Sequence, residues 1–217
     1  AVVVRAVVDT TYSRLAPADL EPFHELMKDL FPGVHAHRAK HHQLRSSFKE
    51  HLLGAGLRHV ACLEHKMVQL YDALATRRGV LVVGKAYSGK TTSISTLARA
   101  LTSLAESGSP EERPVRTAAI CPGCLSPEQL LGSHAGSTPE WTDGVLVSLL
   151  RGLARDPEPV RWWLRLDGAP DSTWADALGP ALGEGCSLCL HSGETLPLPH
   201  EASLVFESED LAGASPG

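Results

Sequence analysis

The sequence lacks a long apolar run, and it lacks an excess of positive charge. No hydrophobic stretch in its 217 residues approaches the length needed to cross a bilayer, and the chain does not open with the basic and then apolar segment of a secretory signal. Lysine and arginine number 20 against 25 aspartates and glutamates, so the net charge is −5. This balance argues against general nucleic-acid binding, and we expect neither nucleic acid nor membrane as a partner.

The composition excludes two further classes of protein. With 43% hydrophobic and 21% charged residues, the chain has enough apolar residues for a core and is neither disordered nor collagen-like. Its length is that of one ordinary domain with a small appendage. The first residues, AVVVRAVV, include no Met, so we expect a piece of a longer protein.

Cysteine is sparse and odd in number. Five cysteines without a signal segment predict reduced thiols in a cytosolic compartment. Two pairs have CxxC spacing, Cys121 with Cys124 and Cys186 with Cys189. Four thiolates can hold zinc tetrahedrally, but the pairs lie further apart in the chain than the two halves of a compact zinc ribbon. The two pairs could form a zinc site or could be unpaired thiols, and the distance between the pairs along the chain favours unpaired thiols.

Helical periodicity marks the first third of the chain. Apolar residues at helical spacing predict a helix over residues 20–30 that Pro32 ends. Two further helices are expected over about residues 42–55 and 63–75. We therefore interpret residues 1–66 as a helical lead-in.

Strands and helices alternate in the rest of the chain. Short apolar runs predict strands, and they are residues 80–83, 115–120, 162–166 and 203–206. Ser126, with Gln129 three residues later, has the capping-box pattern that begins a helix. The alternation predicts an α/β fold with a mainly parallel sheet over residues 67–217.

The strongest chemical pattern lies between the first predicted strand and the helix after it. Residues 84–91 match G-x-x-x-x-G-K-[ST] in the strand–loop–helix context that this phosphate-binding motif requires. Backbone N–H groups of such a loop and the positive end of the next helix form an anion site. Lys90 can reach the terminal phosphates of a nucleotide, and Thr91 can offer its hydroxyl to Mg²⁺. The predicted nucleotide site comprises Gly84, Lys85, Ala86, Tyr87, Ser88, Gly89, Lys90, Thr91 and Thr92.

A carboxylate for the metal is expected at the end of a neighbouring strand. Asp167 follows the predicted strand 162–166, so Thr91 and Asp167 are the candidate Mg²⁺ side chains, with a turn-capping aspartate as the alternative. Gly168 stands where a hydrolytic enzyme of the Asp-Glu type carries the glutamate that activates water. The lack of a general base costs a factor of roughly 10²–10⁴ in rate. We therefore expect ATP or ADP to be bound with Mg²⁺ but not turned over.

Several short segments recur, in the same order and spacing, in dynein heavy chains. The sequence resembles the second AAA+ module of the dynein motor ring, preceded by the linker between the first and second modules, and the resemblance covers nearly the whole chain. The Val-Gly-Lys entry to the phosphate-binding loop is more similar to axonemal than to cytoplasmic dyneins. The matching segments are Asp29–Gly33, Lys66–Tyr71, Val83–Lys85 with Gly89–Thr91, Glu140–Gly144, Asp167–Gly168, Gly193–Glu194 and Ala214–Pro216.

The resemblance implies a P-loop AAA+ three-layer sandwich around a parallel sheet, here expected to stop before the fifth strand and the helical lid. In that family this module binds nucleotide without hydrolysing it, while the first module drives motility. The implied partners are the neighbouring AAA+ modules of the same heavy chain and, through the parent protein, dynein intermediate and light chains and microtubules. The implied location is the cytoplasm and cytoskeleton, in the ciliary axoneme.

Two residues depart from the family pattern. Tyr87 stands where the family has glycine, and a positive φ there would strain a tyrosine. Arg165 replaces an apolar residue in a strand expected to be buried on both faces. These departures leave open a degenerate scaffold that binds no nucleotide. A stand-alone P-loop ATPase or kinase is a further alternative, although the sequence offers it neither a convincing base nor a basic residue on the substrate side.

Overall fold

The computed structural model describes residues 2–12, 15, 17–34, 41–110, 112–134, 140–156, 158–170, 174–183, 185–212 and 214. The chain divides into two units, residues 1–77 and 78–217. The boundary follows helix α4 (Ala61–Thr76), so residue 66, the end of the predicted lead-in, lies inside that helix. Ser215 and Pro216 of the dynein-like segments lie outside the described residues.

The first unit is helical. It contains α1 (Val2–Tyr12), the 3-10 turn η1 (Pro17–Asp19), α2 (Leu20–Leu30), α3 (His42–Gly54) and α4. The three helices expected from periodicity are confirmed, and α2 ends just before Pro32 as expected. The sequence does not predict α1, because its β-branched valines have low helix propensity.

Helix α4 is central to the packing of the first unit. It contacts both α1 and α3. Phe48 of α3 and Met67 of α4 are completely buried. Glu64 accepts hydrogen bonds from Arg45 and from His59, whose Nε2 lies 2.5 Å from the carboxylate. Burial raises the pKa of Glu64, but the hydrogen bonds from His59 and Arg45 together lower it by more than burial raises it. The pKa of Glu64 is therefore below its usual value.

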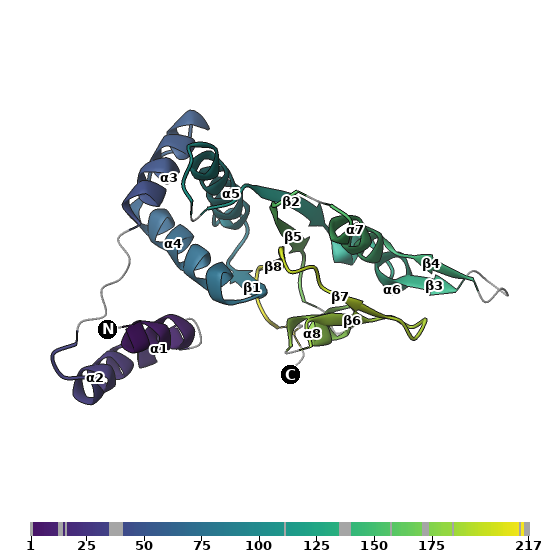
Figure 1. Cartoon of the computed structure of the whole chain (residues 1–217), viewed down its shortest axis with the longest axis horizontal. Coiled ribbons are helices and arrows are strands. Elements are labelled where there is room, and N and C mark those ends of the chain that lie inside the picture. Colours follow the sequence, from purple (N-terminus) through teal and green to yellow (C-terminus); the bar gives the residue numbers. More distant parts are fainter. Residues whose placement is uncertain are drawn as a thin grey trace. The chain divides into compact units, whose positions relative to one another are not determined.

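The second unit contains the parallel sheet (Figure 1). Its strands β1, β8, β5 and β2 pair in that order, and every pairing is parallel, which confirms the predicted α/β fold and the four predicted strands. The elements are β1 (Gly79–Val83), α5 (Lys90–Glu106), β2 (Val115–Ile120), η2 (Pro122–Cys124), α6 (Pro127–Leu131), β3 (Gly132–His134), β4 (Trp141–Asp143), α7 (Val145–Ala154), β5 (Arg161–Asp167), α8 (Ala175–Leu182), β6 (Ser187–Cys189), β7 (Thr195–Pro197) and β8 (Ala202–Ser208).

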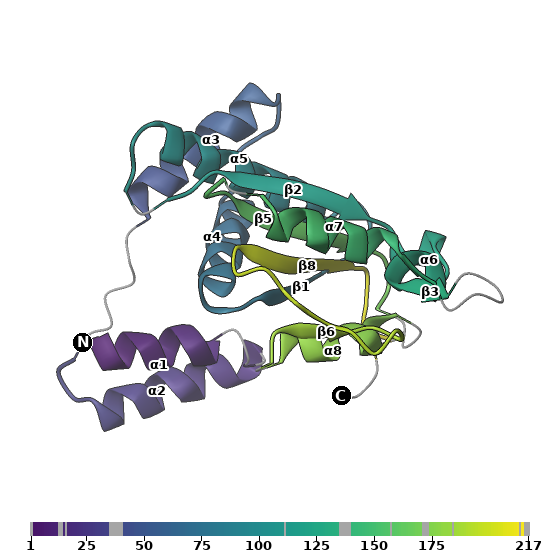
Figure 2. The ribbon, with the colours of Figure 1, turned by 45° about the vertical axis from the view of Figure 1, so that its right-hand side comes forward.

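Helices flank the sheet, with α5 on one side and α7 on the other (Figure 2). Alternate side chains of a strand point to opposite faces. Leu204 and Phe206 of β8 therefore pack in the core with α7 and α8. Val205 and Glu207 point to the other face, where Glu207 meets the first turn of α5. This alternation decides which side chains can reach the predicted site.

Two antiparallel hairpins, β3–β4 and β6–β7, lie outside the sheet and are not predicted by the sequence. The helix α6 before the first hairpin begins with the predicted capping box. Gln129 N donates to Ser126 Oγ at 3.2 Å, and Ser126 N donates to Gln129 Oε1 at 2.9 Å. The capping box is confirmed.

Candidate functional site

The predicted phosphate-binding loop connects β1 to α5 at the carboxyl edge of the sheet. Gly89, directly before the first residue of α5, has a φ of 89°, a left-handed conformation that glycine adopts without strain. A Cβ on Gly84 would lie 2.7 Å from Ser88 Oγ, so the loop turns tightly on itself. The N–H groups of the first turn of α5 have no acceptor within the helix. The helix therefore begins with a partial positive charge at the loop, which suits an anion.

Tyr87 has the left-handed backbone that the sequence analysis identified as costly. Its φ is 62°, and its side chain is fully exposed. This backbone costs a residue other than glycine roughly 1–2 kcal/mol. Because the ring is exposed, its packing does not offset the strain. The loop therefore has the expected tight turn, with Tyr87 as a strained residue in it.

A cavity of about 400 Å³ lies beside the loop. Its volume is in the range of small-molecule sites, and ligands of open parallel sheets commonly bind beyond the carboxyl ends of the strands. The structure brings four predicted residues to its wall, namely Ala86, Lys90, Thr91 and Asp167. The full lining is Ala86, Lys90, Thr91, Asp167, Gly168, Ala169, Glu207, Ser208, Glu209 and Asp210.

The ammonium group of Lys90 is bonded within the loop. Its Nζ donates to the carbonyl of Gly84 at 2.5 Å and to that of Lys85 at 3.1 Å. A phosphate would have to replace these carbonyls as the acceptor. A phosphate carries a negative charge that the two carbonyls lack, and its Coulomb attraction to the ammonium lets it compete for Lys90.

Thr91 is bonded to a carboxylate that the sequence analysis does not assign to the site. Its Oγ1 donates to Glu207 Oε2 at 2.6 Å, and Arg165 Nε donates to Glu207 Oε1 at 2.7 Å. The side chain of Glu207 is 1% exposed and that of Arg165 is 14% exposed. The guanidinium thus compensates a buried carboxylate that would be costly alone. Arg165, the departure noted in the sequence, has its partner on the neighbouring strand.

Asp167 ends β5 opposite Glu207 in the β5–β8 register. Its side chain is exposed and lines the cavity, and its role as a metal-side carboxylate stays a prediction. Gly168, whose N–H donates to the Glu207 carbonyl at 3.0 Å, offers no side chain that could act as a base. Both carboxylate oxygens of Glu207 already accept hydrogen bonds. Neither residue is therefore arranged to deprotonate a water molecule.

The other predicted loop residues shape the loop rather than line the cavity. They are Gly84, Lys85, Tyr87, Ser88, Gly89 and Thr92. Glu207 is the residue that sequence reasoning missed. The signal was present, because Glu207 directly follows the predicted strand 203–206 just as Asp167 follows its own.

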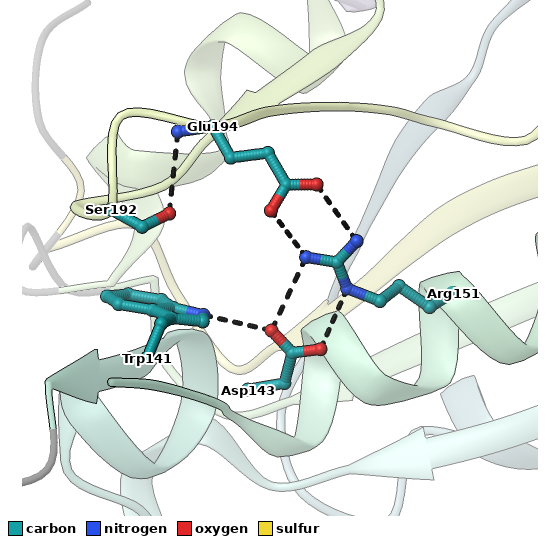
Figure 3. A network of polar contacts seen from close by, with 5 residues as sticks. All are labelled: Trp141, Asp143, Arg151, Ser192 and Glu194. Carbon is teal, nitrogen blue, oxygen red and sulfur yellow. Dashed lines mark hydrogen bonds and ion pairs between the residues drawn. The ribbon is translucent and has the colours of Figure 1, made fainter. Parts of the chain in front are cut away.

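Two of the dynein-like segments meet at Arg151 (Figure 3). Arg151 Nε donates to Asp143 Oδ2 at 2.7 Å, Arg151 Nη2 donates to Glu194 Oε2 at 2.6 Å, and Trp141 Nε1 donates to Asp143 Oδ1 at 2.9 Å. The hydrogen bonds to Glu194 and to Asp143 raise the pKa of Arg151, and the bond from Arg151 lowers the pKa of Glu194. Asp143 ends β4 and Glu194 precedes β7, so Arg151 of α7 joins the two hairpins.

The zinc interpretation of the two CxxC pairs is not supported. All five cysteines lie in the described residues, and none is in a disulfide. Across that part of the chain, no three or more His, Cys, Asp and Glu side chains gather in a way that could hold a metal ion. Within the described ranges, no helix is both long and apolar enough to cross a membrane.

Comparisons with known proteins connect these features to one family. The family model described as "Hydrolytic ATP binding site of dynein motor region" matches residues 1–91, which end at Thr91 of the loop. Dynein axonemal heavy chain 2 of Mus musculus is 33% identical over 99% of this chain. The chain belongs to the dynein heavy chain family.

Two further dynein heavy chains show a similar degree of identity to this chain. Dynein axonemal heavy chain 12 of Homo sapiens is 31% identical over 98% of the chain. The Dynein-1-beta heavy chain, flagellar inner arm I1 complex, of Chlamydomonas reinhardtii is 33% identical over 99%. The chain spans only 5 to 7% of the length of these dynein heavy chains. The family and the α/β fold expected from the resemblance are thereby confirmed.

Proposed function

We propose that this chain is a nucleotide-binding, non-hydrolysing AAA+ module of a dynein heavy chain, the second module of its motor ring. The observation that carries the proposal is the meeting of Lys90, Thr91 and Asp167 at one cavity beside the N-terminus of α5. A cation, a hydroxyl and a carboxylate are the side chains that a nucleotide with Mg²⁺ requires. The ligand is ATP or ADP.

Each residue has a distinct part in the proposed binding. The N–H groups at the start of α5 and the Lys90 ammonium would bind phosphate oxygens. Thr91 Oγ1 and the Asp167 carboxylate would hold Mg²⁺, directly or through water. To do so, Thr91 must exchange its bond to Glu207 for the metal, and Glu207 would keep its bond from Arg165.

The charge of the cavity explains why the metal is needed. Its lining includes the carboxylates Asp167, Glu207, Glu209 and Asp210, with Lys90 as the lining cation. A nucleotide phosphate would meet a net negative wall, because Arg165 compensates only Glu207. Mg²⁺ supplies the missing positive charge between the carboxylates and the phosphates. We therefore expect nucleotide affinity to depend strongly on Mg²⁺.

The absence of hydrolysis is proposed from the residues at the end of β5. Gly168 follows Asp167, and Glu207, the buried carboxylate at the cavity, accepts bonds at both oxygens. The matched family model carries the word hydrolytic, but its match ends at Thr91 and does not reach β5. The rate contribution of a general base, roughly 10²–10⁴-fold, is missing.

The wider setting of the module is also part of the proposal. The relatives are named as axonemal or flagellar dynein heavy chains. We place the chain in an ATP-driven microtubule motor of the ciliary axoneme, within the cytoplasm and cytoskeleton. There it would contact the neighbouring AAA+ modules of the same heavy chain. Intermediate chains, light chains and microtubules would be reached through the parent protein.

Titration with fluorescent ATP and ADP, with and without Mg²⁺, tests the proposal. Lys90→Ala removes charged hydrogen bonds of about 1.5–3 kcal/mol each, so affinity should fall at least about tenfold. Arg99→Ala is the matched control, because it removes one positive charge from an exposed position on the same helix. Equal binding by the parent and by Lys90→Ala would contradict the site. Phosphate release by the parent clearly above that of Lys90→Ala would contradict non-hydrolysis.

A scaffold that binds no nucleotide is the second candidate. It is favoured by the bonds that already occupy the site, from Lys90 to the loop carbonyls and from Thr91 to Glu207, and by the strained Tyr87. The same titration separates the two candidates. Absence of saturable binding in the parent, at any Mg²⁺ concentration, would favour the scaffold.

A further inference from the structure

The segment Cys121-Pro122-Gly123-Cys124 forms a tight turn outside the nucleotide cavity. Cys124 N donates to the Cys121 carbonyl at 3.1 Å, and Leu125 N donates to the Pro122 carbonyl at 3.0 Å. Residues three apart in a 3-10 turn lie on the same side of it. The two thiols accordingly meet, with the Cys124 Sγ donating to the Cys121 Sγ at 3.2 Å. Both cysteines are exposed, whereas Pro122 is buried and anchors the turn.

This geometry is close to that of a disulfide. A 3-10 turn advances about 2.0 Å per residue, so the two Cα atoms are separated by about 6 Å along it. Disulfides usually join Cα atoms 4.4–6.8 Å apart, with an S–S bond of about 2.05 Å. Closing the pair thus requires the sulfur atoms to approach by roughly 1 Å, which side-chain rotation can supply without a change of backbone.

The second CxxC pair has the same spacing and a different backbone. Cys189 is the last residue of β6, and the two residues between it and Cys186 are extended. Three steps of about 3.3 Å along a strand separate the Cα atoms by about 10 Å, beyond the reach of a disulfide. The thiol of Cys186 donates instead to the carbonyl of Gly183 at 3.3 Å. One sequence pattern therefore occurs twice, and only one copy has its thiols together.

We propose that Cys121 and Cys124 are a reversible thiol–disulfide pair, oxidised by low-molecular-weight disulfides such as oxidised glutathione. The thiolate of Cys121 attacks one sulfur of glutathione disulfide, forms a mixed disulfide and expels one glutathione thiolate. Cys124, as its thiolate, attacks the Cys121 sulfur, forms the Sγ–Sγ bond and expels the second. Two electrons pass from the protein to glutathione, and the two thiol protons end on the two glutathione thiols.

The order of attack follows from the contact between the thiols. The hydrogen bond to Cys121 and the charge of a Cys121 thiolate raise the pKa of Cys124, so Cys124 is the thiol that attacks second. Once Cys121 is in the mixed disulfide, that charge is gone and Cys124 can lose its proton. Cys124 is then held beside the sulfur that it attacks.

Mass spectrometry of tryptic peptides can test the proposal on the chain itself, because each group of cysteines falls in its own peptide. Cys121 and Cys124 lie in Thr117–Arg151, Cys186 and Cys189 lie in Leu166–Gly217, and Cys62 lies in His59–Lys66. The chain is equilibrated with mixtures of reduced and oxidised glutathione in the presence of a chelator. Free thiols are then alkylated, and each peptide is weighed before and after reduction.

We expect the Thr117–Arg151 peptide to lose two hydrogen atoms and to resist alkylation until it is reduced. At the glutathione ratio where it is half oxidised, the Leu166–Gly217 peptide should be oxidised to less than about a tenth, because only the first pair gains from proximity. Cys124→Ser should leave Cys121 as a stable mixed disulfide with glutathione. Equal oxidation of both pairs, or two separate glutathione adducts on Thr117–Arg151 in the parent, would overturn the proposal.

Discussion

Arg165 offers a sharp test of the packing inside the sheet. Arg165→Met removes the guanidinium and leaves an unbranched apolar side chain in its place. The Glu207 carboxylate, which is only 1% exposed, then keeps the Thr91 hydroxyl but loses the guanidinium among the contacts described above. Removal of one member of a buried ion pair costs about 3–5 kcal/mol. Whole domains have unfolding free energies of about 5–15 kcal/mol, so this change should remove a large part of the stability of the second unit.

The charge of Glu207 is the reason for the expected loss, and a second variant isolates it. In Arg165→Met/Glu207→Gln both charges are gone, and the Gln carbonyl can still accept the bond from Thr91. We expect the double variant to recover all but about 0.5–1.5 kcal/mol, the contribution of an ordinary hydrogen bond. Glu207→Gln alone completes the cycle, and the coupling of the two charges is the free-energy change of the double variant minus those of the two single variants.

Urea unfolding followed by tryptophan fluorescence measures these free energies. Trp141, Trp162, Trp163 and Trp174 all lie in residues 78–217, so the signal reports the second unit alone. Arg113→Met is the matched control, because Arg113 pairs with Glu201 on the surface with both side chains at least 41% exposed. A surface pair contributes about 0–1 kcal/mol. If Arg165→Met unfolds like the control, the Arg165–Glu207 pair does not stabilise the sheet.

Three further changes test other parts of the structure. Tyr87→Gly should relieve roughly 1–2 kcal/mol of backbone strain and raise nucleotide affinity or melting temperature, and a change in neither would show that the loop is not strained. Gly144→Ala should destabilise the chain in a thermal melt, because its Cβ would lie 2.4–2.6 Å from backbone atoms of Leu130 and Gly132, whereas Gly152→Ala, in open space on α7, should be neutral or stabilising. Arg151 lowers the pKa of Glu194 in the folded state. The contact therefore stabilises the fold fully at pH values above the pKa that Glu194 has in the unfolded chain, and this stabilisation is lost as the pH falls through the lower pKa of the folded state. The melting temperatures of the parent and of Glu194→Gln should therefore differ at neutral pH and converge in acid; a constant difference would contradict this.

The sheet and the phosphate-binding loop were predictable because their signals are local. Apolar runs identify the four parallel strands, and the glycines around Lys90 identify the turn between β1 and α5. The capping box of α6 is equally local, because its two residues are three apart and contact one another directly. Sequence patterns of this kind report the conformation of a few neighbouring residues.

The two hairpins and the partner of Arg165 were not predictable in this way. The strands β3, β4, β6 and β7 are each three residues long, too short for a periodic pattern. They are joined through Arg151, whose partners Asp143 and Glu194 are far apart in the chain. From the sequence alone, Arg165 is an unexplained charge in a strand expected to be buried. Its partner Glu207 becomes its neighbour only when β5 and β8 pair, and a local pattern does not contain that information.

Glu207 links the stability of the sheet to the readiness of the nucleotide site. Its carboxylate accepts one bond from Arg165, which holds it in the sheet, and one from Thr91, which the proposed metal requires. If Thr91 turns to a metal, Glu207 loses the hydrogen bond from a neutral hydroxyl but keeps the one from the guanidinium, so the carboxylate remains compensated. Without Arg165, the same movement would leave a buried charge with no partner among these contacts. In the proposed binding, Arg165 would therefore let Thr91 leave Glu207 for the loss of one hydrogen bond, while the carboxylate keeps its opposite charge.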